Sequence, residues 1–194
     1  MDGSPMENAK NNLLALLKER AYTPGLVTLA SGKQSDFYID CRKVAFTGQG
    51  HQLIGHAFLS QLGGLESELN LRFAGCAGMA LGAVPLASAL ALIAFQKDRD
   101  LSAVVVRKTA KGHGAGNQVE GTDAFSKGDR LILLEDVVTS GGSAIIAINA
   151  LREAGFVIEH ALCLVDREEG GAGNLADAGV TLHPLFKRSD FLAD

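Results

Sequence analysis

Two adjacent carboxylates and the small residues after them form the stretch of this sequence best suited to chemistry. Glu135 and Asp136 end the apolar run of "LLEDVVTSGGSA", residues 133–144, and a loop of threonine, serines and glycines follows at 139–143. Carboxylates accept hydrogen bonds from sugar hydroxyls, and the backbone N–H groups of such a loop, together with the helix after it, can hold an anion. The pattern therefore predicts a site for a sugar phosphate.

The same residues also fit a plainer interpretation. A glycine pair after a strand is often only a turn, and acids at the end of a strand often face water. The stretch lacks the GxxxxGK[ST] pattern of a P-loop. Taken alone, these residues leave the turn and the ligand site equally open.

A cluster of positive charges supplies the second candidate. The segment "VVRKTAKGHGAGNQVEG", residues 105–121, is polar, rich in glycine and basic. Its cations could neutralise a negatively charged leaving group, although such a run also fits a solvated turn. We expect residues 108–121 to form a flexible loop. The candidate catalytic residues in this segment are Arg107, Lys108, Lys111 and His113.

The elements that must position these groups alternate between strands and helices from about residue 70 onward. The predicted strands are continuously apolar, which indicates burial on both faces and hence an α/β fold with a parallel sheet flanked by helices. Ligands bind beyond the carboxyl ends of such strands, where the two acids lie. The predicted strands span 71–78, 102–108, 129–138, 158–168 and 180–186, and the predicted helices span 83–98, 143–155 and about 170–179.

A small N-terminal hood is expected beside this sheet. We expect one domain over residues 1–194, in which the hood takes in about 1–45 and the C-terminal segment. Phe73 and Phe95 are predicted to lie in the core. The elements predicted in the first part of the chain are helices over 6–20 and 50–64, the second ending at a glycine pair, and strands over 26–32 and 36–42.

The bulk composition bounds the class of protein. The 194 residues include 18 basic and 22 acidic ones, so the net charge of -4 gives no reason to expect nucleic acid or an anionic membrane as partner. The longest apolar run, around 80–95, is broken by glycine, proline and serine and is not expected to span a membrane. Three widely spaced cysteines predict neither a disulfide framework nor a zinc site. The polar N-terminus does not resemble a signal peptide, so we expect a cytoplasmic protein.

The acid pair and its loop resemble a known motif. "LLEDVVTSGGSA" is similar to the phosphoribosyl diphosphate (PRPP) binding motif of the type I phosphoribosyltransferases: an apolar strand, two acids, two apolar residues, threonine, small residues and glycine. The resemblance implies the fold of that family, contacts of both acids with the ribose hydroxyls, and a loop that holds the 5′-phosphate. The residues that it assigns to PRPP are Glu135, Asp136, Val137, Val138, Thr139, Ser140, Gly141, Gly142 and Ser143.

Three further segments narrow the resemblance to the orotate phosphoribosyltransferases. The basic segment fills every position of that family's catalytic-loop pattern, RKxxKxHG followed by EG. "LASGKQSDFYIDCRK", residues 29–43, is similar to the hood segment SGxxSxxYxDxR, whose Tyr38 fits either the pyrimidine pocket or plain hood packing. "LVDREEGG", residues 164–171, resembles a strand end whose arginine, here Arg167, meets the orotate carboxylate. Thr139 is assigned to orotate as well.

The resemblance implies an activity, a cofactor and partners. An orotate phosphoribosyltransferase transfers the phosphoribosyl group of PRPP to orotate, which gives orotidine 5′-monophosphate and diphosphate in de novo UMP biosynthesis. Mg²⁺ is implied to bind mainly through PRPP rather than at a protein metal site. A homodimer is implied, in which the basic loop reaches the neighbouring subunit's site, and the length suits a stand-alone enzyme.

Two alternatives to this activity stay open. One is a phosphoribosyltransferase that acts on a purine base, against which the complete basic loop argues. The other is a non-enzymatic PRPP-binding regulator on the same fold. Such a regulator would be expected to lose the basic loop or to gain a DNA-binding segment, and this sequence does neither.

One position departs from the family pattern. Many relatives carry a lysine in the loop before the helix that contains Pro85, in a pattern like AYKGIPL, whereas this chain has "ALGAVPL" with Gly82 at the lysine position. A cation that would touch pyrophosphate or phosphate is therefore missing. Either backbone N–H groups of residues 78–83 serve in its place or another basic residue does.

Overall fold

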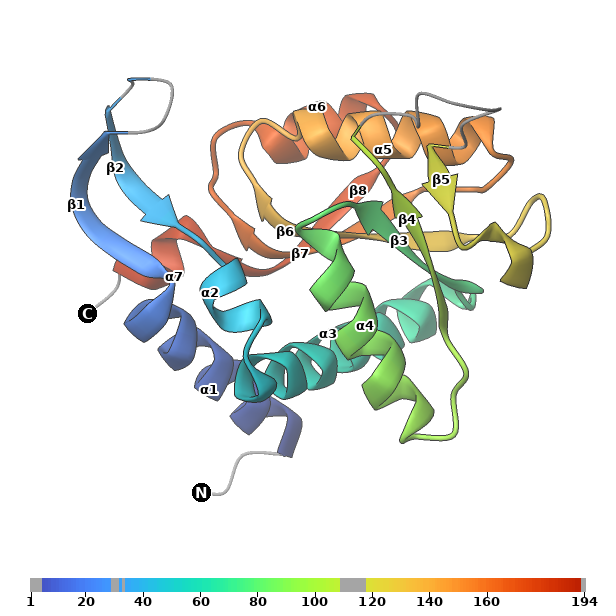
Figure 1. Ribbon diagram of the computed structural model, residues 1–194, viewed down its shortest axis with the longest axis horizontal. Helices are drawn as coiled ribbons and strands as arrows, with labels where there is room; N and C mark the ends of the chain where they lie inside the picture. The colour runs from blue at the N-terminus through green and yellow to red at the C-terminus, as the bar shows by residue number, and fades with distance from the viewer. Residues whose placement is uncertain (1–4, 29–31, 33, 109–117, 193–194) are drawn as a thin grey trace.

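A six-stranded sheet between two layers of helices forms the centre of the computed structural model (Figure 1), which describes residues 5–28, 32, 34–108 and 118–192. The strand order is β5-β4-β3-β6-β7-β8, and all neighbours are parallel except β5, which is antiparallel to β4. This arrangement confirms the predicted fold class. The strands are β3 (Gly75–Met79), β4 (Ser102–Val106), β5 (Val119–Glu120), β6 (Leu131–Val138), β7 (His160–Asp166) and β8 (Thr181–Lys187).

Helices cover both faces of the sheet, which explains the continuously apolar strands. They are α1 (Pro5–Arg20), α3 (Gly48–Leu69) and α4 (Ala83–Phe95) on one side, α5 (Gly142–Glu153) and α6 (Gly171–Asp177) on the other, and a 3-10 helix, η1 (Thr122–Ala124), after β5. In β6, Ile132 and Leu134 belong to the core formed with α3 and α4, whereas Leu131 and Leu133 belong to the core formed with α5. None of the described helices is long and apolar enough to cross a membrane.

The hood stands outside the main sheet, on the left of Figure 1. It contains an antiparallel hairpin, β1 (Tyr22–Thr28) and β2 (Gln34–Ile39), the short helix α2 (Arg42–Ala45) and the C-terminal helix α7 (Arg188–Leu192). The ring centroids of Tyr22 and Phe37 lie 5.2 Å apart, and each lies 5.7 Å from the ring of Phe191. The C-terminal segment therefore packs directly against the hairpin.

Helix α3 is longer than predicted. It continues through Gly63 and Gly64 to Leu69 and ends with Asn70 in the left-handed conformation, at φ 49°. Glycine inside a helix costs about 1 kcal/mol relative to alanine. Leu65, directly after the glycine pair, is buried in the core. Tertiary packing of the helix therefore outweighs the local preference of the two glycines to end it.

Two other expectations are corrected by the structure. Residues 119–120 form β5 although the predicted loop ran to 121, because the buried Val119 pairs with β4. Residues 109–117 of that loop lie outside the described residues. Phe95 is 70% exposed at the end of α4 instead of lying in the core, whereas Phe73 is buried as predicted.

Candidate active site

The two acids lie at the carboxyl end of β6, in the middle of the sheet. Only 5% of Glu135 is exposed, and its Oε1 atom is buried with no hydrogen-bond partner among the described residues. Burial, with a smaller contribution from the charge of Asp136, raises the pKa of Glu135 to about 8. Burial also raises the pKa of Asp136, although its Oδ1 accepts a hydrogen bond from Val137 N at 2.9 Å. A buried carboxylate oxygen without a donor favours a ligand that supplies one.

The loop after β6 leads directly into the N-terminus of α5. Gly141 adopts φ 77°, a conformation open to glycine without strain, and the helix starts at Gly142. The loop encloses a cavity of about 240 Å³, where backbone N–H groups and the helix N-terminus favour an anion. Around this cavity the structure brings together the residues predicted to bind PRPP, apart from Asp136. The lining residues are Glu135, Val137, Val138, Thr139, Ser140, Gly141, Gly142, Ser143 and Ala144.

Helix α6 supports the loop from behind, through residues that the sequence did not single out. Asn174 Nδ2 donates a hydrogen bond to Ser140 O at 2.9 Å. A Cβ atom at Gly171 would lie 2.4 Å from Val138 Cγ1 and 2.5 Å from Thr139 O, so only glycine permits this approach. Residues 170–179 were predicted as a turn and short helix without a role at the site, and no sequence signal marked Asn174.

A second cavity, of about 300 Å³, lies between the acids and the hood. Gly82 approaches Asp136 so closely that a Cβ atom on it would lie 2.8 Å from the Asp136 carboxyl group. A side chain at position 82 would therefore force that carboxyl group to move, which fits the glycine found there. The lining residues are Tyr38, Ile39, Asp40, Cys41, Arg42, Met79, Ala80, Leu81, Gly82, Glu135, Asp136, Val137 and Ser143.

The predicted catalytic residues of the basic segment are only partly described. Arg107 and Lys108 directly follow β4, at the same carboxyl edge of the sheet as the acids. Arg107 Nε lies 3.0 Å from Glu120 Oε1, and neither Arg107 nor Lys108 is among the described residues that line the two cavities. Lys111 and His113 lie outside the described residues.

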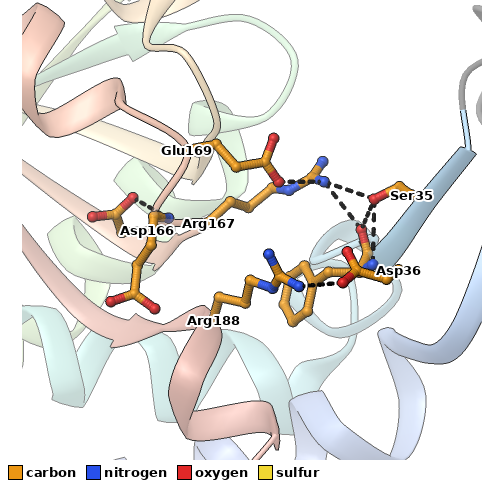
Figure 2. Close-up of polar contacts among 8 residues, drawn as sticks. Ser35, Asp36, Asp166, Arg167, Glu169 and Arg188 are labelled. Carbon is orange, nitrogen blue, oxygen red and sulfur yellow. Dashed lines mark hydrogen bonds and ion pairs between the residues drawn. The ribbon is translucent and has the colours of Figure 1, made fainter.

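Arg167, predicted to bind orotate, connects the end of β7 to the hood, as Figure 2 shows. Its Nη2 donates to Ser35 Oγ at 3.0 Å and to Phe37 O at 3.1 Å, and it lies 2.7 Å from Glu169 Oε1. Its Nε atom is buried and has no partner among the described residues. The guanidinium therefore retains a donor for an anionic ligand. Thr139, the second residue assigned to orotate, lies in the loop of residues 139–143, which we call the phosphate-type loop.

Comparison with known proteins shows that this chain is similar to orotate phosphoribosyltransferases. A curated relative of that name from Sorangium cellulosum (strain So ce56) is 42% identical over 185 residues, which cover 95% of this chain and 94% of the relative. Another from Thermosynechococcus vestitus is 40% identical over 193 residues, which cover 100% of this chain and 97% of the relative. A comparison with family profiles gives no match.

Solved structures agree with the sequence relatives. The orotate phosphoribosyltransferase of Aeropyrum pernix gives a TM-score of 0.74 at 34% identity, over 93% of this chain and 96% of that one. The Mycobacterium tuberculosis H37Rv orotate phosphoribosyltransferase in complex with PRPP gives a TM-score of 0.74 at 26% identity, over 95% of this chain and 99% of that one. An adenine phosphoribosyltransferase from Trypanosoma brucei, at 13% identity and a TM-score of 0.62 over 98% and 82%, shares the fold alone.

Proposed function

This chain belongs to the orotate phosphoribosyltransferase family, and we propose from that premise how its residues carry out the family's reaction. The reaction transfers the phosphoribosyl group of PRPP to N1 of orotate and gives orotidine 5′-monophosphate and diphosphate, a step of pyrimidine biosynthesis. One observation carries the assignment of roles: two buried acids and an anion-binding loop share the carboxyl edge of a parallel sheet.

PRPP is assigned to both cavities, with its ribose over the acids. The backbone N–H groups of residues 139–143 would hold the 5′-phosphate. Glu135 and Asp136 would accept hydrogen bonds from the ribose hydroxyls, which would give Glu135 Oε1 the donor that it lacks among the described residues. The two cavities share Glu135, Val137 and Ser143, so one ligand can extend from the first into the second. The diphosphate on C1′ would then enter the second cavity.

Departure of the diphosphate builds positive charge on the ribose and negative charge on the leaving group. The acids beneath the ribose would stabilise its positive charge, and the cations of the basic segment would stabilise the negative charge of the diphosphate. Ala80, which lines the second cavity, donates a hydrogen bond from its N atom to Val106 O at 2.8 Å. The basic segment, which contains Val106, therefore starts beside that cavity, and this position supports the role. No protein nucleophile is required, since orotate attacks C1′. The residues given this role are Arg107, Lys108, Lys111 and His113, of which His113 could also donate a proton.

Arg167 is the proposed partner of the orotate carboxylate. A guanidinium offers a planar fork of donors that matches a carboxylate. Three observations support the assignment: its position at the end of β7, its contacts with β2 of the hood, and its buried, unpartnered Nε among the described residues. Orotate would therefore lie between the sheet edge and the hood, with Tyr38 on the wall of the adjoining cavity.

Mg²⁺ is the proposed cofactor, bound mainly through oxygens of PRPP. The carboxylates of Glu135 and Asp136 both line the second cavity and are the hard oxygen donors that Mg²⁺ prefers. Among the described residues, no three His, Cys, Asp or Glu side chains cluster in a way that could hold a metal ion. Substrate oxygens would therefore complete the coordination. When bound, the ion would neutralise charge on the diphosphate.

A homodimer is the proposed assembly. Phe46 and Leu92 are 59% and 50% exposed and line an apolar cavity of about 730 Å³ beside α4. Phe95 is exposed at the end of the same helix. Apolar side chains gathered on one surface mark interaction sites. A second copy would cover them and, as the family resemblance implies, bring the basic loop of one subunit to the site of the other.

The proposed location is the cytoplasm. Cys41, Cys76 and Cys163 are free and buried. Burial raises the pKa of each thiol, that of Cys76 to about 12, and so keeps all three protonated. Free thiols of this kind fit a reducing compartment.

Consumption of orotate tests the assignment directly. Orotate absorbance should fall only when the protein, PRPP and Mg²⁺ are all present. Adenine, hypoxanthine and uracil serve as control bases and should not be converted. Conversion of a purine base with orotate left unchanged would overturn the proposed function.

A further inference from the structure

Three carboxyl groups line the cavity between the acids and the hood. They belong to Asp40, Glu135 and Asp136, and among the described lining residues Arg42 is the only Lys, Arg or His. A diphosphate that entered this cavity would be repelled by each of these groups that is ionised, and the pKa of Asp40 is lowered. A cation on the cavity wall would offset that repulsion, and Arg42 is placed to do so.

Arg42 is oriented by the residue two positions before it. Its Nε and Nη2 atoms donate to the two carboxylate oxygens of Asp40, at 2.7 Å and 3.0 Å. The hydrogen bond from Arg42 is the largest of the effects that lower the pKa of Asp40, so the partner stays ionised. A guanidinium has five N–H groups. This pairing uses only two of them and leaves the outer edge of the fork for an anion.

The ion pair leaves the guanidinium accessible. The side chain of Arg42 is 52% exposed, whereas that of its partner Asp40 is 18% exposed. Position 82 offers no side chain for the same task, because Gly82 stands against the carboxyl group of Asp136.

We propose that Arg42 binds the diphosphate of PRPP and supplies the cation that is missing at position 82. The assignment rests on the proposed function: with the 5′-phosphate in the loop and the ribose on the acids, the C1′ substituent enters the cavity that Arg42 lines. The fork would pair with diphosphate oxygens both in the substrate and in the departing group. Arg42 is thus a substrate-binding residue contributed by the hood.

The test compares two neighbouring charges. Arg42→Gln removes the proposed ligand, and Lys43→Gln removes the same charge from the next residue, which is exposed and does not line the cavity. Each protein is titrated with pyrophosphate plus Mg²⁺ and, separately, with orotidine 5′-monophosphate, which has the phosphate, ribose and base but no diphosphate. Thermal unfolding confirms that each variant is folded.

Arg42→Gln should weaken pyrophosphate binding at least about tenfold and raise the KM for PRPP, while the affinity for orotidine 5′-monophosphate stays unchanged. Lys43→Gln should match the wild type in every measurement. Arg42→Lys keeps the charge but loses the fork, so its pyrophosphate affinity should fall between those of the wild type and Arg42→Gln.

Equal pyrophosphate affinity in Arg42→Gln and Lys43→Gln would overturn the proposal. A parallel loss of both ligands would also overturn it, because that result indicates a structural role. If Arg42→Gln fails to fold, Arg42→Lys decides, and wild-type pyrophosphate affinity in that variant rejects the assignment. The titrations require no turnover, so a wild-type protein that leaves orotate unchanged would count against the proposed function alone.

Discussion

Glu135 shows at the scale of one residue how the site opposes stability. In an unfolded chain this carboxyl group has its ordinary pKa of 4.5, whereas burial raises the pKa in the folded protein to about 8. Between these values the folded state binds more protons than the unfolded state. The contribution of this group to the free energy of unfolding is therefore largest below about pH 4.5, and the protein loses it as the pH rises through about 8.

Glu135→Gln should raise stability and lower activity. The amide of glutamine cannot ionise. At pH 8 the free energy of unfolding of the variant should therefore exceed that of the wild type by about 1–3 kcal/mol, and the difference should shrink toward pH 5. The KM for PRPP should rise because the variant loses a carboxylate acceptor. Denaturant unfolding at the two pH values and PRPP saturation curves measure both effects. A stability difference that does not depend on pH would contradict the raised pKa.

Arg167→Lys should act on orotate rather than on PRPP. Lysine keeps the charge but loses the planar fork and the contacts to Ser35 and Phe37, so the KM for orotate should rise about tenfold or more. The KM for PRPP should change much less. Arg130→Lys, in an exposed ion pair with Glu159, is the control and should leave both constants unchanged. Equal increases in both constants would argue against a carboxylate role for Arg167.

A local pattern in the sequence can single out candidate site residues. Glu135 and the glycines after it could be recognised because strand, acids and loop are consecutive in the chain. Asn174 reaches Ser140 across 34 positions, and Gly82 meets Asp136 only because β3 pairs with β6. Such contacts depend on the order of strands in the sheet, which no local pattern contains.

At the scale of elements, the apolar runs predicted the strands and helices of the sheet but not all of their ends. The continuous runs of β6 and β7 reflect burial on both faces, so their existence and type followed from composition. The end of α3 did not, because a helix that is anchored by Leu65 passes through two glycines. Two-residue β5 is too short to leave a pattern, and it forms because β4 offers a free edge.

The close contact between α6 and the phosphate-type loop predicts the outcome of one glycine substitution. Gly171→Ala would place a methyl group 2.4 Å from Val138 Cγ1 and 2.5 Å from Thr139 O, so the loop must shift. We expect a loss of about 1–3 kcal/mol in stability and a higher KM for PRPP. Enzyme assays and thermal unfolding would measure the two effects.

Gly173→Ala is the matched control on the same helix. A methyl group there would meet nothing within 4 Å, and the helix conformation suits alanine. This variant should keep the wild-type KM and gain up to about 1 kcal/mol of stability. If Gly171→Ala behaves like Gly173→Ala, helix α6 does not support the loop in the way proposed.

At the scale of the whole molecule, the exposed apolar surface beside α4 predicts the oligomeric state. Leu92→Glu would place a charge in the proposed interface, so the variant should have a mass near the 20.3 kDa of one chain, whereas the wild type should have twice that mass. Orotate turnover should fall with the loss of the dimer. Light scattering coupled to size exclusion measures the mass.

Leu192→Glu is the control for this prediction. Leu192 is also an exposed leucine, but it lies on α7 at the hood, away from the residues that line the apolar cavity. That variant should remain dimeric. A monomeric wild type, or dissociation in both variants, would reject α4 as the interface.

The alternation of strand β6 is interrupted at its two acids. Before them, Ile132 and Leu134 belong to the core with α4, and Leu131 and Leu133 belong to the core with α5. After them the order is reversed, because Val137 packs against the first core and Val138 belongs to the second. Both carboxyl groups line one cavity. Inserting or deleting one residue before the acids would displace them and the loop along the strand by roughly 3 Å. We therefore expect the length of β6 to matter to the site as much as the identity of its two acids.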